Sequence, residues 1–458
     1  MKHRALKIII GLMVAACSFT ACLDSESTVY EPSHNAAITA FAIADSIVTR
    51  YPAIVDGKDT TLTTGIVGTD YPFAIDQTQG QIYNPDSLPV GTDISRVKVS
   101  ISADGYGIYI AAEKDSLWEE TDSLDFNQPV QFKVLAQDGN FGRVYTARIN
   151  VHQQDPDAMG WTRIASNFHR ATGAMKAVLC QGSMHVLTEQ PDGVFVTSST
   201  DGTLWTEPVS IDTPKKADIH SAMVWGKQLY ILAQGELYTS ADARTWSRVD
   251  TEQRFSALIA GIHTEHVQKL VATDIEGRYA ESTDGKTWLT LDNVPEGFPK
   301  QGASAVAYAL DTNENLGRMV LMGGNEAGQD STTVAWTVLT TETQWTELTP
   351  PDAASACPKL ENLTLIRYNG SLYAMGGAGR HGGEIAPFSA FYRSDDNGIT
   401  WAECSKGMTM AEEFEGLYEA ADGNYTCIVD DEDCIWLFWG NTGEVWRGRL
   451  NKLGFERK

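Results

Sequence analysis

A short phrase, repeated along the C-terminal part of the chain, constrains the fold more than any other feature. Its clearest copy is Glu281-Ser282-Thr283-Asp284-Gly285-Lys286-Thr287-Trp288. Asp favours a turn because its side chain bonds to the backbone, and Gly reaches the positive φ that many turns need. A strand beginning with Trp follows, and its large apolar ring is expected to fill the space between two packed sheets. The phrase therefore predicts a recurring hairpin turn in an all-β fold.

Related phrases recur at fairly regular intervals. The residues expected to form these turns and their Trp anchors are Ser199, Asp201, Trp205, Asp242, Trp246, Ser282, Asp284, Trp288, Ser394, Asp396 and Trp401. Trp161 and Trp345 keep only the end of the phrase. A repeat of about 40 to 57 residues indicates a solenoid or a propeller.

The strands within the repeats can be counted. Residues 221–249 read as three apolar strands separated by turns and followed by a Trp strand. Four strands per unit are typical of a propeller blade. The last repeat ends without a Trp strand, whereas residues 160–165 form a Trp strand without partners. We therefore predict a six-bladed β-propeller closed by the strand around Trp161, because closure removes exposed sheet edges.

The first residues carry the pattern of an export signal. A basic start precedes the apolar run 8–16, which is too short to span a bilayer as a helix, and small residues lead to Cys22. This pattern resembles a bacterial lipoprotein signal, which implies removal of residues 1–21 and lipidation of Cys22. Cys17 ends a competing box, but the acidic stretch after Cys22 resembles the export tag of surface lipoproteins in Bacteroides-like bacteria. The resemblance implies a lipid anchor in the outer membrane, exposure at the cell surface, and a tether at 22–35.

Residues 36–152 alternate apolar and polar side chains in short runs such as 131–135. Such alternation predicts half-buried strands, and a domain built this way is most often a β-sandwich. The segment Val134-Leu135-Ala136-Gln137-Asp138-Gly139 resembles part of the ending of immunoglobulin-like modules at the front of Bacteroides-type surface lipoproteins. The resemblance implies an Ig-like β-sandwich that acts as a spacer. Residues 153–158 then form a linker to the predicted propeller at 159–458.

The repeated phrase itself resembles the Asp-box of sialidases and related propellers, and its full-length copy lies at 394–401. Residues 320–324 and 372–377, each ending in Gly-Gly, resemble kelch repeats. The two-domain chain resembles uncharacterised Bacteroides-type lipoproteins whose C-terminal half is often labelled galactose-oxidase-like. These resemblances imply propeller architecture and say little about function.

The amino-acid composition limits the kinds of molecule that the protein is expected to bind. The net charge is −25 and no basic run appears, which argues against nucleic acid and fits a soluble acidic surface. Five cysteines follow Cys22, so at least one is unpaired. Cys427 and Cys434 flank an acidic turn and form either a cross-hairpin pair or, as we favour, buried free thiols. No Cys/His spacing suggests zinc, and no metal or cofactor is expected.

The candidate ligand site lies on the propeller axis. Propellers bind ligands there, on the face that carries the loops between second and third strands and between blades. The candidates on this face are Phe168, His169, Arg170, His220, Arg254, Arg380, His381, Trp439 and Asn441. Each candidate also has an interpretation without a ligand. Arg380 and His381 would then lie in a solvated glycine-rich loop, and each Trp would pack between blades.

Enzymatic interpretations fit less well. A sialidase resemblance would imply three arginines, a Tyr–Glu pair and an acid, and galactose oxidase would imply two Tyr and two His on copper. The Arg-Ile-Pro sequence usual in sialidases is missing and residues 168–171 are a poor substitute, while the histidines are too few and scattered for the copper site. No catalytic residue is therefore assigned. We expect a cell-surface lipoprotein whose propeller is a non-catalytic binding module for a glycan or a protein partner. The alternatives are a glycan-acting enzyme with a carboxylate pair in the central pocket, and a structural component of an envelope complex.

Overall fold

The structure is a computed structural model, and it describes residues 31–55, 58–166, 168–169, 173–213, 216–299, 303–323, 332–378 and 385–454. The predicted signal peptide and Cys22 lie outside these residues, as do Arg170, Arg380 and His381. The chain divides into two compact units, residues 1–155 and 156–458.

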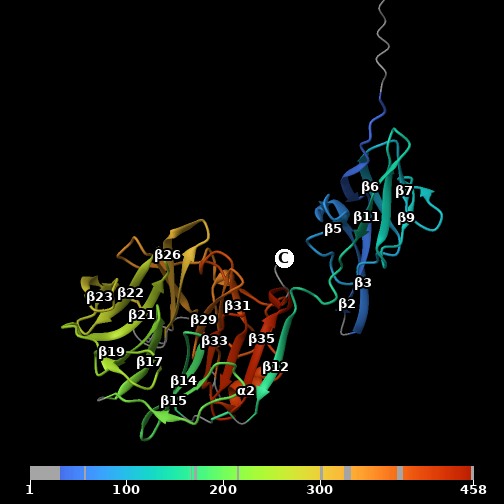
Figure 1. Ribbon diagram of the computed structural model, residues 1–458. Helices are drawn as coiled ribbons and strands as arrows, with labels where there is room; N and C mark the ends of the chain where they lie inside the picture. The colour runs from blue at the N-terminus through green and yellow to red at the C-terminus, as the bar shows by residue number, and fades with distance from the viewer. Residues whose placement is uncertain are drawn as a thin grey trace, which may run out of the picture. The chain divides into compact units, whose positions relative to one another are not determined.

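The first unit is built from strands, coloured blue to cyan in Figure 1. Its largest sheet has, in spatial order, the strands β4 (Ala74–Asp76), β5 (Gln81–Tyr83), β11 (Phe141–Arg148), β10 (Val130–Leu135), β7 (Gly107–Ile110) and β8 (Ser116–Leu117). A second sheet consists of β1 (Ala37–Ile43), β6 (Val97–Asp104) and β9 (Ser123–Leu124). A hairpin is formed by β2 (Ser46–Val55) and β3 (Lys58–Val67), and the 3-10 turn η1 (Gly68–Asp70) follows it.

The two sheets of the first unit share one hydrophobic core. Along β6, Val97, Val99 and Ile101 are buried and alternate with more exposed residues, as period-two alternation requires. The ring centroid of Phe41 on β1 lies 6.2 Å from that of Phe132 on β10, so side chains of the two sheets meet between them.

The second unit contains six four-stranded antiparallel sheets within the described residues. Five of them are formed by consecutive strands. They are β13 (Met175–Cys180), β14 (Ser183–Gln190), β15 (Gly193–Ser199) and β16 (Val209–Ser210); β17 (Ala217–Trp225), β18 (Gln228–Ala233), β19 (Glu236–Ser240) and β20 (Ser247–Arg248); β21 (Phe255–His263), β22 (Gln268–Asp274), β23 (Arg278–Ser282) and β24 (Leu289–Asn293); β25 (Ser304–Leu310), β26 (Asn313–Gly323), β27 (Val334–Leu339) and β28 (Thr346–Leu348); and β29 (Thr364–Tyr368), β30 (Ser371–Met375), β31 (Tyr392–Ser394) and β32 (Ala402–Glu403).

The sixth sheet joins the two ends of this unit. Its strands are β33 (Tyr425–Val429), β34 (Ile435–Trp439), β35 (Val445–Leu450) and β12 (Met159–Ala165). β12 pairs antiparallel with β35, with Met159 opposite Leu450, and Figure 1 shows the green strand beside the red one. The short helices are α2 (Phe414–Ala420) and the 3-10 turns η2 (Ala353–Ser355) and η3 (Asn451–Gly454).

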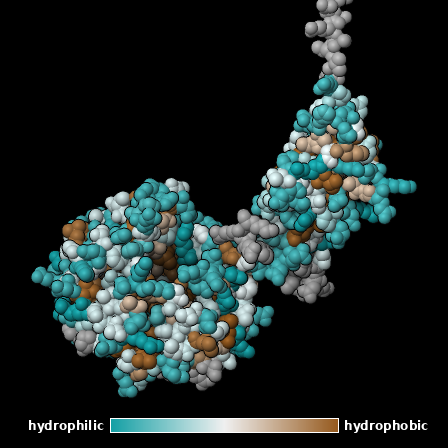
Figure 2. Space-filling view, viewed as in Figure 1, coloured by the Kyte–Doolittle hydropathy of each residue, from teal (hydrophilic) through white to brown (hydrophobic). Residues whose placement is uncertain are grey.

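The first strands of the six sheets are neighbours in a cycle. β13 contacts β17, β17 contacts β21, β21 contacts β25, β25 contacts β29, β29 contacts β33, and β33 contacts β13. We call these six the innermost strands. Figure 2 shows that the visible surface of this unit is mostly hydrophilic, with scattered hydrophobic residues and a hollow.

The repeated phrase forms the same kind of turn at residues 199–205, 240–246, 282–288 and 394–401, which we call the box turns. In the 394–401 turn, Ser394 Oγ accepts the N–H of Gly398 at 2.8 Å, and Asp396 Oδ1 accepts the N–H of Thr400 at 2.9 Å. Gly398 has a φ of 102°, which only glycine adopts readily. The Ser and Asp side chains thus satisfy backbone donors that a tight turn leaves without strand partners.

Packing of the box Trp residues explains why the phrase ends in Trp. Trp246 and Trp401 are 6% and 5% exposed. The Trp401 Nε1–H donates to the Gly398 carbonyl at 3.0 Å, so the indole is buried with its polar group satisfied. Trp205 lies 5.4 Å from Phe438 on β34 between ring centroids, which places a box ring against a neighbouring sheet.

Trp401→Ala is expected to destabilise the protein by about 3–5 kcal/mol, because removing a buried aromatic ring loses transfer free energy and leaves a cavity. Urea unfolding of the protein that begins after Cys22, followed by circular dichroism, measures the change. The control is Leu204→Ala, whose side chain is 78% exposed and whose loss should change stability by less than about 0.5 kcal/mol. Equal effects of the two substitutions would contradict the packing role of Trp401.

The box carboxylates also link stability to pH. Backbone hydrogen bonds from Thr287 and Lys286 lower the pKa of Asp284 from 3.8 to about 2, and those from Leu204 and Thr203 lower the pKa of Asp201 in the same way. A carboxylate whose folded-state pKa is lowered stabilises the protein above its unfolded pKa, and this contribution is lost as the pH falls toward 2.

The double substitution of Asp201 and Asp284 by Asn should therefore lower stability at pH 7, and the difference from wild type should shrink between pH 4 and pH 2. The urea midpoint at pH 7, 4, 3 and 2 measures it. Asp431→Asn, at an exposed position outside the box turns, should show no such trend. A difference that stays constant across this range would show that the charge of the box carboxylates is irrelevant.

Candidate functional site

The end of the second unit where the innermost strands begin holds a cavity of about 410 Å³, which we call the axial cavity. The beginnings of β13, β25, β29 and β33 form most of its walls. Its lining is Gly173, Ala174, Met175, Lys176, His220, Ala303, Ser304, Asn362, Leu363, Thr364, Asp422, Gly423, Asn424, Tyr425, Thr426 and Cys427. The volume lies within the range of about 300–1,000 Å³ that is usual for small-molecule pockets.

Hydrogen bonds between neighbouring sheets hold these walls in place. Thr426 Oγ1 on β33 accepts the N–H of Ala177 on β13 at 2.8 Å. Ser304 Oγ on β25 accepts the N–H of Leu365 on β29 at 2.9 Å. Because these hydroxyls already bond to the backbone of the next sheet, they fix the shape of the cavity.

Lys176 is the cation of the axial cavity. It lies on β13 and lines the cavity, and burial lowers the pKa of its ammonium below the ordinary value of 10.5. Across the part of the chain that the structure describes, no hydrogen bond or ion pair joins Lys176 to another residue. Lys176 is half-buried, so its ammonium is only partly solvated, and an anion that enters the cavity could serve as its partner.

Cys427 on β33 is the neighbour that interacts electrostatically with Lys176. Burial raises the pKa of the Cys427 thiol to about 12, so the thiol stays protonated near neutral pH. A protonated thiol is neither a strong nucleophile nor a metal ligand. Cys427 therefore contributes a small, weakly polar wall to the cavity.

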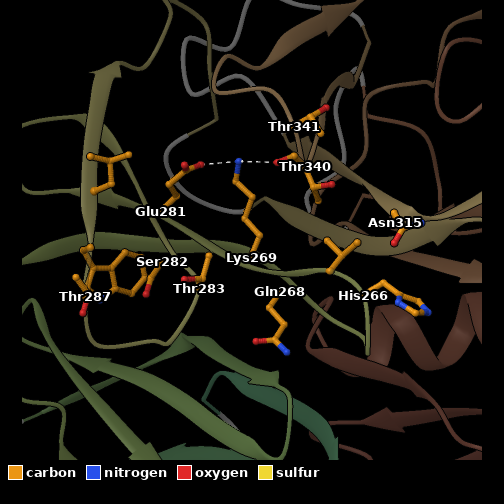
Figure 3. Close-up of a pocket in the computed structure, with 13 residues that line it drawn as sticks. His266, Gln268, Lys269, Glu281, Ser282, Thr283, Thr287, Asn315, Thr340 and Thr341 are labelled. Atoms are coloured by element: carbon orange, nitrogen blue, oxygen red, sulfur yellow. Dashed lines mark hydrogen bonds and ion pairs between the residues drawn. The ribbon is translucent and has the colours of Figure 1, made fainter.

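A second recess, which we call the side pocket, has a volume of about 600 Å³. It lies between the sheet of β21–β24 and the sheet of β25–β28, at the turns joining first to second and third to fourth strands, and thus at the opposite end of the strands from the axial cavity. Figure 3 shows Glu281, Lys269 and Thr340 in a row joined by dashed lines, with Ser282 and Thr287 to one side and His266 and Asn315 to the other.

Lys269 in the side pocket is fully engaged, unlike Lys176. Its Nζ lies 2.5 Å from Glu281 Oε2 and donates to the carbonyl oxygens of Thr340 at 3.1 Å and Glu342 at 3.0 Å. These bonds tie one sheet to the next. The charge of Lys269 is thus used within the protein.

Two of the aromatic candidates from the sequence are corrected by the structure. Phe168 is 5% exposed and Trp439 is 0% exposed, so neither ring presents a surface to a ligand. Phe168 packs on Trp205 and Phe438, and Trp439 packs on Tyr425. Phe168 lies in one hydrophobic core and Trp439 in another, where Trp439 also contacts Phe388 and Phe414. Packing between blades was the alternative interpretation given for each Trp, and thus for Trp439.

The remaining described candidates are dispersed. His220 is exposed and lines the axial cavity. His169 is half-buried beside Phe168, and Asn441 donates from its amide to the Ala421 carbonyl at 3.2 Å. Arg254 is exposed and donates to the Gln234 carbonyl at 2.5 Å. Of these four, His220 alone is among the residues that line the cavity.

The described residues show no group of three His, Cys, Asp or Glu side chains able to hold a metal ion. Within the same residues, no helix is both long and apolar enough to cross a membrane.

The fold and its recesses define an all-β protein with a β-propeller domain. Residues 155–458 match the family described as DUF6242 beta propeller domain, and residues 42–149 match the DUF6242 N-terminal domain, a domain of unknown function. The chain therefore belongs to the DUF6242 family. The comparison with curated proteins gives no match.

Solved structures resemble the chain only distantly. A structural genomics protein of unknown function from Bacteroides thetaiotaomicron is 11% identical with a TM-score of 0.41, covering 92% of this chain and 99% of that one. The GH93 alpha-L-arabinofuranosidase of Fusarium graminearum is 12% identical with a TM-score of 0.40, and covers 64% of this chain and 99% of its own. Virginiamycin B lyase from Staphylococcus aureus is 11% identical with a TM-score of 0.36, covering 64% and 99%. Similarities at this level carry no argument about function.

The thiols of the described chain are all free, so the alternative of a Cys427–Cys434 bond is not what the structure shows. The free cysteines are Cys180, Cys357, Cys404, Cys427 and Cys434. Burial raises the pKa of each thiol, that of Cys404 to about 11.

Iodoacetamide at pH 8 should therefore alkylate all five native thiols much more slowly than free cysteine, whose pKa is about 8.5. In urea the five should react at the rate of free cysteine. Peptide mass spectrometry of the protein that begins after Cys22 measures each rate. A native Cys427 that reacts as fast as in urea would contradict the burial that raises its pKa.

Proposed function

We propose that the protein is a surface-displayed, non-catalytic binding module and that the axial cavity binds a carboxylate-bearing residue of a glycan. The observation that carries the proposal is Lys176, an ammonium without a described partner in a cavity of about 410 Å³. A carboxylate that accepts a charge-assisted hydrogen bond from Lys176 would supply the missing partner. The exposed side-chain amide of Asn362 offers donors and an acceptor for sugar hydroxyls, whereas the amide of Asn424 donates to the Gly173 carbonyl at 2.7 Å and helps to hold the wall of the cavity.

The net charge of the chain indicates that an acidic ligand would be held by direct contacts and not drawn in by long-range electrostatic attraction. With a net charge of −25, the surface as a whole repels anions. An acidic ligand would therefore gain its binding free energy from contacts inside the cavity, chiefly a charge-assisted hydrogen bond from Lys176. Specificity for a carboxylate would then come from one ammonium.

The architecture we infer for this role follows the sequence-based predictions. The six four-stranded sheets would be the six blades of the propeller, closed by β12, and the box turns would be its Asp-boxes. The first unit would be an Ig-like spacer, and lipidation of Cys22 would anchor the protein at the outer-membrane surface. The pairing of β12 with β35 supports the closure.

A glycan-acting enzyme is the main alternative. Glycoside hydrolysis generally needs two carboxylates flanking the scissile bond. Asp422 is the one carboxylate within the described lining of the axial cavity, and it is exposed. This lining favours binding over hydrolysis, and a structural role in an envelope complex is the third interpretation.

The test is a glycan-array screen of the protein that begins after Cys22, with hydrolysis products monitored on each hit. Uronic-acid and sialic-acid glycans are expected to bind without turnover. Lys176→Met should weaken binding roughly 10- to 100-fold, because a hydrogen bond to a charged group contributes about 1.5–3 kcal/mol. The matched control, Lys227→Met, removes an exposed lysine of the same unit and should leave binding unchanged.

The pH dependence adds an independent readout. Burial places the pKa of Lys176 below 10.5, so binding should weaken as the pH rises from 7 toward that value and the ammonium loses its charge. The other titratable groups of the lining are His220, Asp422, Tyr425 and Cys427, so the profile is compared with that of His220→Gln. Turnover of a bound glycan would replace the binding proposal with the enzymatic one, and retained binding by Lys176→Met would remove its basis.

A further inference from the structure

The sheet edges of the first unit differ in length. The two sheets that share its core end in four edge strands, which are β1, β4, β8 and β9. β8 and β9 have two residues each and β4 has three, so each offers few backbone groups to another chain. β1 has seven residues, and within the described residues no strand pairs with the edge that faces away from β6. A long unpaired edge is a place where another strand can add to a sheet.

The sequence of β1 leaves this edge open. Edge strands are usually protected by charged residues, by proline or by a bulge. β1 reads Ala-Ile-Thr-Ala-Phe-Ala-Ile and contains neither a charged residue nor proline. Its pairing with β6 is irregular between Ile38 and Ala40, and the side-chain amide of Gln77 donates to the Ile38 carbonyl at 2.6 Å. Both features lie at the start of the strand, so the part from Ala40 to Ile43 lacks such protection.

The backbone of Phe41 faces the open edge. The N–H of Ala44, just after β1, donates to the Lys98 carbonyl on β6 at 2.9 Å. Backbone groups of alternate residues point to the same side of an antiparallel strand, so those of Ala42 also point toward β6 and those of Phe41 point away. In the register, Ala42 lies opposite Ser100. Phe41 therefore presents one donor and one acceptor to an added strand.

An apolar groove of about 520 Å³, which we call the edge groove, runs beside β1. Its lining contains no charged side chain and consists of Thr39, Ala40, Phe41, Ala42, Thr69, Tyr71, Pro72, Phe73 and Ile75. The rings of Phe41 and Phe73 lie 4.9 Å apart between centroids. Tyr71, Phe73 and Ile75 are half-buried and pack against the core. The groove thus lies next to unpaired backbone groups and offers apolar contacts.

We propose that the edge groove binds an extended segment of a partner protein, which pairs antiparallel with β1 at Phe41. The main-chain groups of the segment would complete the hydrogen bonds of Phe41, and every second side chain would enter the groove. Those side chains should be apolar, because the lining is uncharged. An ion would find no charged partner in this lining, and an apolar small molecule would leave the backbone donor and acceptor of Phe41 unpaired.

The edge groove belongs to the first unit, whereas the axial cavity belongs to the second. The inference therefore does not depend on the function proposed for Lys176. It gives the first unit a role in binding, beyond that of a spacer.

Hydrogen exchange followed by NMR tests the proposal, with the protein that begins after Cys22 and carries isotope-labelled phenylalanine. The probe is the synthetic peptide Val-Lys-Val-Ser-Ile-Ser-Ala-Asp, which has the sequence of β6, the strand that pairs with β1 on its other side. The Phe41 amide should exchange quickly in the free protein, and saturating peptide should slow it at least about tenfold, because a hydrogen-bonded amide exchanges only when the structure opens. Phe132, on β10 between β7 and β11, is the internal control and should exchange slowly throughout.

Two N-methylated peptides test whether the peptide backbone forms the predicted bonds. In an antiparallel pair at Phe41, the peptide residues whose side chains enter the groove also point their N–H groups at β1. Methylation of the third and fifth residues, Val and Ile, should therefore abolish the slowing of Phe41 exchange. Methylation of the fourth and sixth residues, both Ser, should preserve it. Equal behaviour of the two peptides would overturn the proposal.

Substitutions in the protein locate the binding site. Thr69→Trp places a bulky ring in the wall of the edge groove and should reduce the effect of the peptide on Phe41. Its matched control is Asp70→Trp, at the next exposed residue but outside the lining, and Lys176→Met alters the axial cavity, so both should respond as the wild type does.

Two further results would contradict the proposal. One is a Phe41 amide that exchanges at the same rate with and without the peptide, or a Thr69→Trp variant that responds like the wild type. The other is slow exchange of Phe41 without peptide that becomes slower at higher protein concentration, which would show that a second copy of the chain occupies the edge.

Discussion

The second unit depends on one backbone ladder, between Met159–Ala165 of β12 and Val445–Leu450 of β35. The ladder joins the first strand of the unit to its last, and the Trp161 Nε1–H secures it by donating to the Thr409 carbonyl at 2.8 Å. Closing so long a loop costs entropy that grows only logarithmically with length, so the ladder and its packing suffice to offset it. The sixth sheet also brings β33 against β13. One constraint, the pairing of β12 with β35, therefore both joins the two ends of the unit and brings together the strands that line the axial cavity.

Much of the all-β fold could be predicted from the sequence because its signals are local. Ser394, Asp396 and Gly398 lie within a few residues of one another, and their side chains or φ angles determine the turn without distant partners. The same is true of alternating strands such as β6. Strand counting extends this local information to the whole unit, since the unpaired strand at Met159–Ala165 needs a partner and β35 supplies it.

The candidate sites were less predictable because their residues meet only after the sheets pack. Lys176 reads as one polar residue in an apolar strand, and nothing near it in sequence indicates Cys427 on β33. Trp439 was expected at the surface, but all five residues of β34 are buried, and such a strand has no exposed face.

Two lysines of the second unit differ in the partners that surround their charge. Lys269 is 8% exposed and bonds to a carboxylate and two carbonyls, which is the environment expected of a buried cation that joins two sheets. Lys176 is half-buried, and its surroundings offer an uncharged thiol and hydroxyls already bonded to the backbone. A hydrophobic residue at position 176 would avoid the desolvation cost and fit the apolar strand. The cost is tolerable where an outside anion completes the site, and stability given up in this way is typical of binding positions.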